Sequence, residues 1–214
     1  MDVRYLAWQG HHAGSTVWVL GSGATLNHVD LRMVGPVSVA VNHVALEVGI
    51  WVPFVATNHH GMAQEIAEQM PDTVVVTPEV EQVAPEHACP VRPSAGNVVF
   101  VPTPAQKFGG WNAEADWPDD RTVLPLGPSS VQLALGWAEF IGASGILLAG
   151  VDCARIDGTK NVTGHRNYPE QHFHPELWRQ SLEGSAKVLR SRGVSVHSLN
   201  PWVTLHLEGH RLTE

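Results

Sequence analysis

Short apolar runs recur along the chain and alternate with segments of helical periodicity. Most of these runs are apolar at every position rather than at every second one, which is typical of strands in a sheet covered on both faces. They lie at 16–20, 37–41, 54–56, 73–76, 98–101, 146–149 and 194–198. Because strands that alternate with helices build βαβ units, we expect an α/β fold with a mostly parallel sheet.

Four segments between these runs have the spacing of helices. The segment 130–141 is apolar around most of its circumference, which predicts a buried central helix. The segment 175–192 begins with proline and carries one apolar stripe, so we expect an amphipathic helix with one face in solvent. Shorter helices are predicted at 44–48 and 62–69.

The length and composition fit one domain over residues 1–214. A chain of 214 residues with 43% hydrophobic content can bury one sizeable core. Prolines and glycines interrupt every period over 102–128, where Trp111 and Trp117 lie among acidic residues. Long loops of this kind commonly cover a site or are disordered. Because the tryptophans favour a covering loop, we expect this segment to close over the ligand and exclude water.

The charge and the apolar content exclude some function classes. The formal net charge is −8 and the chain has three lysines, so no nucleic-acid partner is expected. No apolar run approaches the roughly 20 residues of a membrane span, and we expect a cytoplasmic protein. Cys89 and Cys153 have no CxxC spacing, which predicts two unpaired thiols. Homo-oligomer formation stays open.

The first apolar run ends in Gly-Ser-Gly at 21–23, and the run at 146–149 leads to Asp152. Open α/β folds bind ligands at the carboxyl ends of such strands. Glycines let backbone N–H groups approach an anion, and Ser22 and Thr25 add hydroxyl donors. We expect ligand oxygens at this turn, and expect Asp152 to hold a ribose, a metal or a nucleophile, or to cap a turn. A tight turn without a ligand is the alternative. The account of function that rests on this turn fails, though the sheet can stand, if the protein's own side chains fill the corner.

Two further polar positions follow predicted strands or open helices. The second run ends in Asn42 rather than in an acidic residue, and Leu26 breaks the dinucleotide fingerprint, so a nicotinamide-dependent dehydrogenase is disfavoured. Ser129 and Ser130 open the buried helix, where they could cap it while its N-terminus attracts a phosphate. A simple cap is the alternative.

The chain has 13 histidines, several of them in clusters. His172 and His174 would face one side of an extended segment, but no third ligand has the spacing of a metal site, so no metal is predicted. Histidine is also a natural general base for a hydroxyl at neutral pH, because its ordinary pKa is about 6.5.

Five blocks of the sequence follow one another in the order found in two related families. They read Leu20-Gly-Ser-Gly-Ala-Thr-Leu26, Ala40-Val-Asn-His43, Pro128-Ser-Ser-Val-Gln-Leu-Ala-Leu-Gly-Trp137, Ile141-Gly-Ala-Ser-Gly-Ile-Leu-Leu-Ala-Gly-Val-Asp152 and Ser198-Leu-Asn-Pro201. On these blocks the chain resembles the bacterial family 42 sialyltransferases and the 6-hydroxymethylpterin diphosphokinase MptE-like proteins. The resemblance implies a Rossmann-like fold.

The resemblance to the sialyltransferases also implies residue roles. Their glycine turn, the asparagine after the second strand and the serine-containing helix start hold a cytidine nucleotide, and no metal is needed. Their general base precedes the last helix, which points to His174 or His172, with His165 ranked behind them.

The resemblance implies a glycosyltransferase that moves a sugar from a nucleotide-sugar donor, with a CMP-linked sugar as one candidate, to a glycan or small acceptor. The residues expected to bind the nucleotide are Gly21, Ser22, Gly23, Ala24, Thr25, Asn42, Asn58, Ser129 and Ser130. His174 or His172 would deprotonate the acceptor, and Asp152 would position donor or base, without a cofactor. The alternatives are a magnesium-dependent pterin-type pyrophosphokinase, with Asp152 on the metal, and a non-catalytic nucleotide- or glycan-binding protein.

Overall fold

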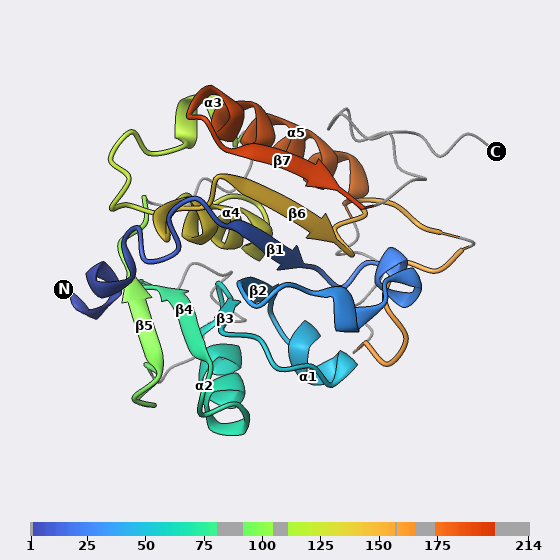
Figure 1. Ribbon diagram of the computed structural model, residues 1–214, viewed down its shortest axis with the longest axis horizontal. Coiled ribbons are helices and arrows are strands. Elements are labelled where there is room, and N and C mark those ends of the chain that lie inside the picture. The colour runs from blue at the N-terminus through green and yellow to red at the C-terminus, as the bar shows by residue number, and fades with distance from the viewer. Residues whose placement is uncertain (1, 81–91, 105–110, 157, 166–173, 200–214) are drawn as a thin grey trace.

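A seven-stranded, all-parallel sheet forms the centre of the molecule (Figure 1). The computed structural model describes residues 2–80, 92–104, 111–156, 158–165 and 174–199. The strands lie in the order β5-β4-β3-β2-β1-β6-β7. They are β1 (Thr16–Leu20), β2 (Ser38–Val41), β3 (Phe54–Ala56), β4 (Val74–Pro78), β5 (Val98–Val101), β6 (Gly145–Ala149) and β7 (Ser195–Ser198). The expected α/β, Rossmann-like fold is confirmed.

Helices cover both faces of this sheet (Figure 1). One face packs against α1 (Val44–Val48) and α2 (His60–Gln69), and the other against α4 (Ser130–Phe140) and α5 (Pro175–Ser191). The short helices are α3 (Ala113–Asp116), η1 (Arg4–Trp8), η2 (Ala24–His28) and η3 (Leu31–Met33). Among the described residues, no helix has both the length and the apolar character needed to cross a membrane.

The continuous apolar runs are explained by these two helix layers. Side chains alternate between the faces of a strand. In β2, Val39 and Val41 join the core beneath α4 and α5, whereas Ala40 joins the core beneath α1 and α2. Because neither face meets water, every position of such a strand is apolar.

The chain reverses its direction across the sheet at β1. From β1 it builds β2 to β5 on one side, and α4 then leads back to β6 on the other side of β1. Leu20 at the end of β1 lies beside Ala149 at the end of β6. In open α/β folds the crevice at such a switch point is the usual place for a ligand. This edge, where the strands end, is called the carboxyl edge below.

Helix α4 is the buried central helix that its sequence predicts. Trp137 is fully buried, and its ring packs at 5.6 Å from that of Phe54. Ser129 caps the helix by accepting from the backbone N–H of Val131 at 3.3 Å, and Gln132 completes a capping box. Crossover helices run antiparallel to the strands, so the capped N-terminus of α4 lies at the carboxyl edge.

The described part of the proline-rich segment packs into the helix layer. Trp117 is 5% exposed, and its Nε1 donates to Glu139 near the C-terminal end of α4 at 3.2 Å. Arg192, at the C-terminal end of α5, donates to the carbonyl oxygen of Pro118 at 2.7 Å. These anchors lie at the end of the helices opposite to the carboxyl edge. Trp117 and Pro118 are thus held away from the carboxyl edge, whereas the covering loop over 102–128 as a whole stays a prediction, and its residues 105–110 lie outside the described residues.

Candidate functional site

The glycine turn after β1 is packed directly against the end of β6. The N–H of Gly21 donates to the carbonyl oxygen of Ala149 at 2.8 Å, and that of Gly23 donates to Gly150 at 2.6 Å. A Cβ on Gly21 would clash with the backbone oxygen of Gly150. The two glycines therefore allow two backbone segments to approach closely, which is a different use from the expected contact with a ligand.

Asp152 fills the remaining corner of this turn. Its side chain is buried, with the residue 3% exposed, and its Oδ2 accepts from the backbone N–H of Thr25 at 2.8 Å. Its Oδ1 accepts from the hydroxyl of Thr25. The carboxylate thus takes the place of the expected anion at the start of η2. A side chain of the protein itself thus fills the corner, so the account of function that rests on ligand oxygens against the N–H groups of Gly21, Gly23 and Thr25 fails. Nucleotide contacts of Ser22 and Ala24 stay predictions.

Replacing Gly21 with alanine is expected to destabilise the protein by about 3 kcal/mol. The added methyl group meets backbone atoms of Gly150, which cannot turn away as a flexible side chain could. Chemical denaturation measures the change in the free energy of unfolding. Gly96→Ala is the matched control, because nothing lies within 4 Å of a Cβ at that glycine. Equal stability of the two variants would contradict the close packing.

A second polar cluster lies at the ends of β2 and β3. Asn42 follows β2 with a left-handed φ of 56°, and Asn58 follows β3 and is 5% exposed. Within the described residues, the side-chain Oδ1 atoms of both asparagines are buried without a hydrogen-bond partner. Leaving a buried acceptor unsatisfied costs roughly 1–3 kcal/mol, so both atoms are candidate acceptors for a donor from a water molecule or a ligand.

The N-terminus of α4 joins this cluster. The Oγ of Ser130 accepts from the backbone N–H of Asn58 at 3.2 Å, which connects the helix start to the end of β3. The side chain of Ser129 caps the helix, which is the simpler of the two roles expected for it. The structure thus brings Asn58 and Ser130 together, and their contact with a nucleotide stays a prediction. A helix N-terminus attracts negative charge, so the cluster combines an anion-attracting end with unsatisfied acceptors.

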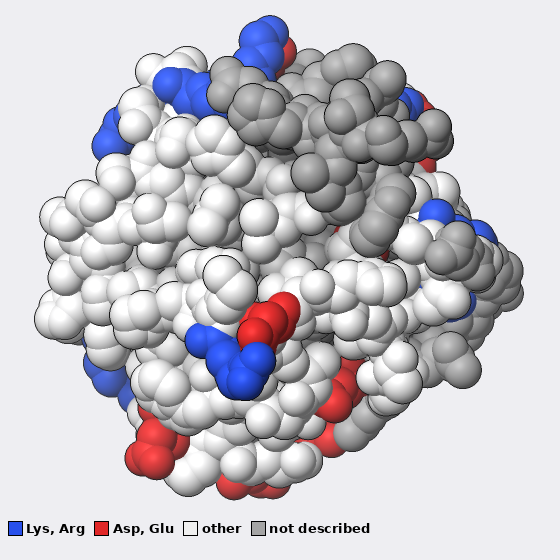
Figure 2. Space-filling model, turned by 45° about the vertical axis from the view of Figure 1, so that its right-hand side comes forward, with Lys and Arg blue, Asp and Glu red and all other residues white. Residues whose placement is uncertain are grey.

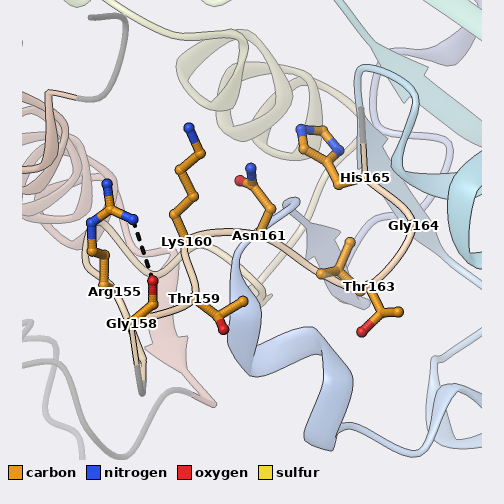
Figure 3. A pocket seen from close by; sticks show the side chains of 9 residues that line it. Arg155, Gly158, Thr159, Lys160, Asn161, Thr163, Gly164 and His165 are labelled. Carbon is orange, nitrogen blue, oxygen red and sulfur yellow. Dashed lines mark hydrogen bonds between the residues drawn. The ribbon is translucent and has the colours of Figure 1, made fainter. Parts of the chain in front are cut away.

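A cavity of about 370 Å³ opens along the segment that follows β6. Its lining residues are Arg155, Gly158, Thr159, Lys160, Asn161, Val162, Thr163, Gly164 and His165. Figure 3 shows the side chains of Lys160, Asn161 and His165 on the same side of this segment. The volume lies within the range of pockets that hold small molecules.

His165 lines this cavity and is paired with a carboxylate. Its Nδ1 lies 2.5 Å from Oε2 of Glu47 in α1, and both side chains are more than nine-tenths buried. A carboxylate on Nδ1 favours the tautomer with the proton on that nitrogen, which leaves Nε2 as the basic atom. The pair therefore has the arrangement of an oriented general base.

His174 and His172, the two histidines favoured by the sequence as general base, are not found in such a pair among the described residues. His174 is exposed at the N-cap of α5, with its ring at 6.5 Å from that of Trp178. It is not among the nine residues that line the cavity. His172 lies outside the described residues. The structure therefore favours His165 over His174 as the histidine held in one orientation.

Cys153 follows Asp152 and is a free thiol. Burial, with smaller contributions from Asp152 and Glu183, raises the pKa of Cys153 to about 12. Because the thiolate reacts and the thiol does not, we expect alkylation at pH 8 to be roughly a thousandfold slower than for an ordinary thiol. Mass spectrometry of a Cys89→Ser variant treated with iodoacetamide measures the rate. A rate equal to that of the unfolded chain would contradict the burial.

The described part of the chain contains no cluster of side chains that could form a metal site. No group of three or more His, Cys, Asp or Glu side chains there is placed to hold an ion. Asp152, the candidate ligand of the kinase alternative, is engaged by Thr25.

Three residues of the site were not singled out from the sequence. Glu47 lies in the short helix after Asn42, and Lys160 and Asn161 lie in the polar connection after β6. The connection itself carries a signal, since it directly follows the strand that leads to Asp152. Nothing in the sequence pairs Glu47 with His165, because 118 positions separate them.

Comparison with known proteins adds no relative to this description. A scan against models of protein families finds none that matches the chain, and a search of curated proteins likewise finds no match.

Proposed function

We propose that this protein transfers a sugar from a nucleotide-sugar donor to an acceptor hydroxyl at the carboxyl edge of its sheet. The observation that carries the proposal is the buried pair of His165 and Glu47 at the edge of a cavity of about 370 Å³. The sequence resemblance to glycosyltransferases supports the same reaction.

The paired histidine suits the proton transfer that this reaction needs. The acceptor oxygen attacks the anomeric carbon of the donor, and the bond from that carbon to the nucleotide phosphate breaks. Nε2 of His165 takes the proton of the acceptor hydroxyl, and the leaving nucleotide takes the electron pair. Glu47 stabilises the imidazolium that forms, because opposite charges attract strongly in a buried place.

The second polar cluster supports binding of the nucleotide part. Asn42 and Asn58 offer buried carbonyl oxygens that accept hydrogen bonds from ribose hydroxyls or from a base. The N-terminus of α4 at Ser130 adds a place for negative charge. Asp152 takes no part in this proposal, because it caps η2.

A panel of nucleotide-sugar donors tests the proposal. The protein is mixed with CMP-, UDP- and GDP-linked sugars and with glycan acceptors, with and without magnesium, and the released nucleotide is measured. We expect release that depends on the acceptor and is lost in His165→Asn. His197→Asn is the matched control, since this exposed histidine lies in β7.

Other outcomes of this panel separate the alternatives. Turnover of ATP and a pterin that requires magnesium would replace the transferase with a pyrophosphokinase. Binding of a nucleotide without any turnover, seen as a thermal shift unaffected by His165→Asn, would leave a non-catalytic binding protein. Transfer that is lost in His174→Asn but kept in His165→Asn would move the base to His174.

A further inference from the structure

Among the described strands, β5 is the last on one side of the sheet. The carbonyl oxygens of Asn97 and Val101 accept hydrogen bonds from the backbone of β4 and of the residue after it, both at 2.9 Å. Backbone groups of successive residues in a strand point to alternate sides, so the carbonyls of Gly96 and Val98 and the N–H of Phe100 face outward. Such outward groups are a template on which another strand can pair.

The side chains of Asp2 and Arg4 occupy these outward groups. Arg4 donates from Nη1 to the carbonyl oxygen of Gly96 at 3.0 Å and from Nη2 to that of Val98 at 2.8 Å. The N–H of Phe100 donates to Oδ2 of Asp2 at 3.4 Å. Arg4 also donates to the carboxylate of Asp2, from Nε at 3.0 Å and from Nη2 at 2.8 Å. The two side chains therefore form one unit, called the edge pair below, which bonds to the open side of β5 as a neighbouring strand would.

The helix that follows the edge pair holds it in place. Arg4 begins η1, which lies beside β5 (Figure 1). In η1, the buried ring of Tyr5 packs at 5.5 Å from that of Phe140, and the ring of Trp8 lies 5.1 Å from that of Phe54. Because two rings anchor η1 to the core, the side chains at its start are kept against the edge of the sheet.

A second pair with the same spacing shows that ion pairing alone does not produce such a cover. Nη2 of Arg32 lies 2.7 Å from Oδ2 of Asp30. Within the described residues, the guanidinium of Arg32 donates to Asp30 alone. Figure 2 likewise shows basic and acidic side chains in contact on the visible face. Surface ion pairs of this kind contribute little by themselves, so the bonds to a strand distinguish the edge pair from an ordinary surface pair.

The strand beneath the edge pair has the character of a segment that pairs readily. It reads Asn97-Val-Val-Phe-Val101, without a charge or a proline, and is rich in β-branched and aromatic residues. Proteins commonly protect such edges with charged side chains, because an open apolar edge promotes association. The partner that fits is β5 of a second copy, since two identical edges can pair antiparallel about a twofold axis.

We propose that the edge pair closes the open side of β5 and thereby keeps a second copy of the chain from pairing with this strand. A pairing strand needs the same backbone groups that Arg4 and Asp2 hold, so the two arrangements exclude each other. Hydrogen bonds from Arg4 lower the pKa of Asp2 to about 2. The carboxylate is therefore ionised at neutral pH, where the cover is expected to be fully formed.

Self-association tests this role. Asp2→Ala/Arg4→Ala is compared with the wild type and with Asp30→Ala/Arg32→Ala by analytical ultracentrifugation over a range of protein concentrations, well below the unfolding temperature. We expect the edge-pair variant to associate about tenfold or more tightly than the wild type, because backbone groups of β5 become available to another strand. The control removes the same two charges from the surface and should associate as the wild type does.

Hydrogen exchange locates the contact between copies. In the edge-pair variant at low protein concentration, the amide of Phe100 should exchange about tenfold faster than in the wild type, because its acceptor on Asp2 is lost. At high concentration the same amide should be protected again, because a second copy supplies an acceptor. If the double variant fails to fold, Arg4→Met with Arg32→Met as its control gives the same two measurements.

Two outcomes would overturn the proposal. One is association of the edge-pair variant no tighter than that of the control. The other is tighter association without renewed protection of Phe100, since the copies would then meet at another surface. Neither measurement uses a nucleotide sugar, so the result does not depend on the proposed function.

Discussion

Replacing His165 with asparagine is expected to lower kcat for sugar transfer by a factor of about 10² to 10⁴, the usual contribution of a general base. Asparagine keeps a polar side chain of similar reach but cannot take up a proton at neutral pH. Because the histidine acts on the acceptor hydroxyl, KM for the donor should change little. Steady-state kinetics with the donor found in the panel measures both constants.

Replacing Glu47, the partner of His165, is expected to lower kcat less than replacing His165 itself. Glu47→Gln retains a hydrogen-bond acceptor for Nδ1 but removes the charge, so we expect a fall in kcat of about 10- to 100-fold, as for other groups that orient a functional histidine. Because Glu47 acts through His165, KM for the donor should stay near the wild-type value. A wild-type kcat in Glu47→Gln would count against the pair as an oriented base.

Replacing Asp152 with alanine is expected to lower the free energy of unfolding by about 3 to 5 kcal/mol, because two hydrogen bonds to a buried charge are lost. The variant leaves the N–H and the hydroxyl of Thr25 without their acceptor at a buried position. Chemical denaturation gives the value. Asp72→Ala is the control, since Asp72 is exposed in the turn after α2 and should change stability by less than about 0.5 kcal/mol.

The Asp152→Ala variant also shows whether this carboxylate caps η2 or binds a ligand. Thr25→Val removes one of the two donors, and its effect should not add to that of Asp152→Ala, because both act on one contact. If Asp152→Ala unfolds like the wild type but no longer binds a nucleotide, the carboxylate is a ligand-binding group and its role as a cap is refuted.

The architecture was predictable because its signals are local. Apolar runs at every position indicate strands between two layers, and the structure places strands at the predicted runs with ends that differ by at most two residues. Ser129 before α4 and the proline at the start of α5 likewise mark helix ends through their nearest neighbours. Such signals depend on residues a few positions apart, so one sequence contains them.

The sequence by itself thus determined the parallel sheet, the buried central helix and the edge at which polar side chains collect. Only the tertiary structure decided how those side chains are used. Asp152 meets Thr25 across 127 positions, and Glu47 meets His165 across 118. Glycines suit a bound anion and a close backbone contact equally well, and only the partner brought by folding distinguishes the two. Contacts between distant segments therefore decide which polar groups at this edge bond to the protein itself, and a local sequence pattern carries no information about such contacts.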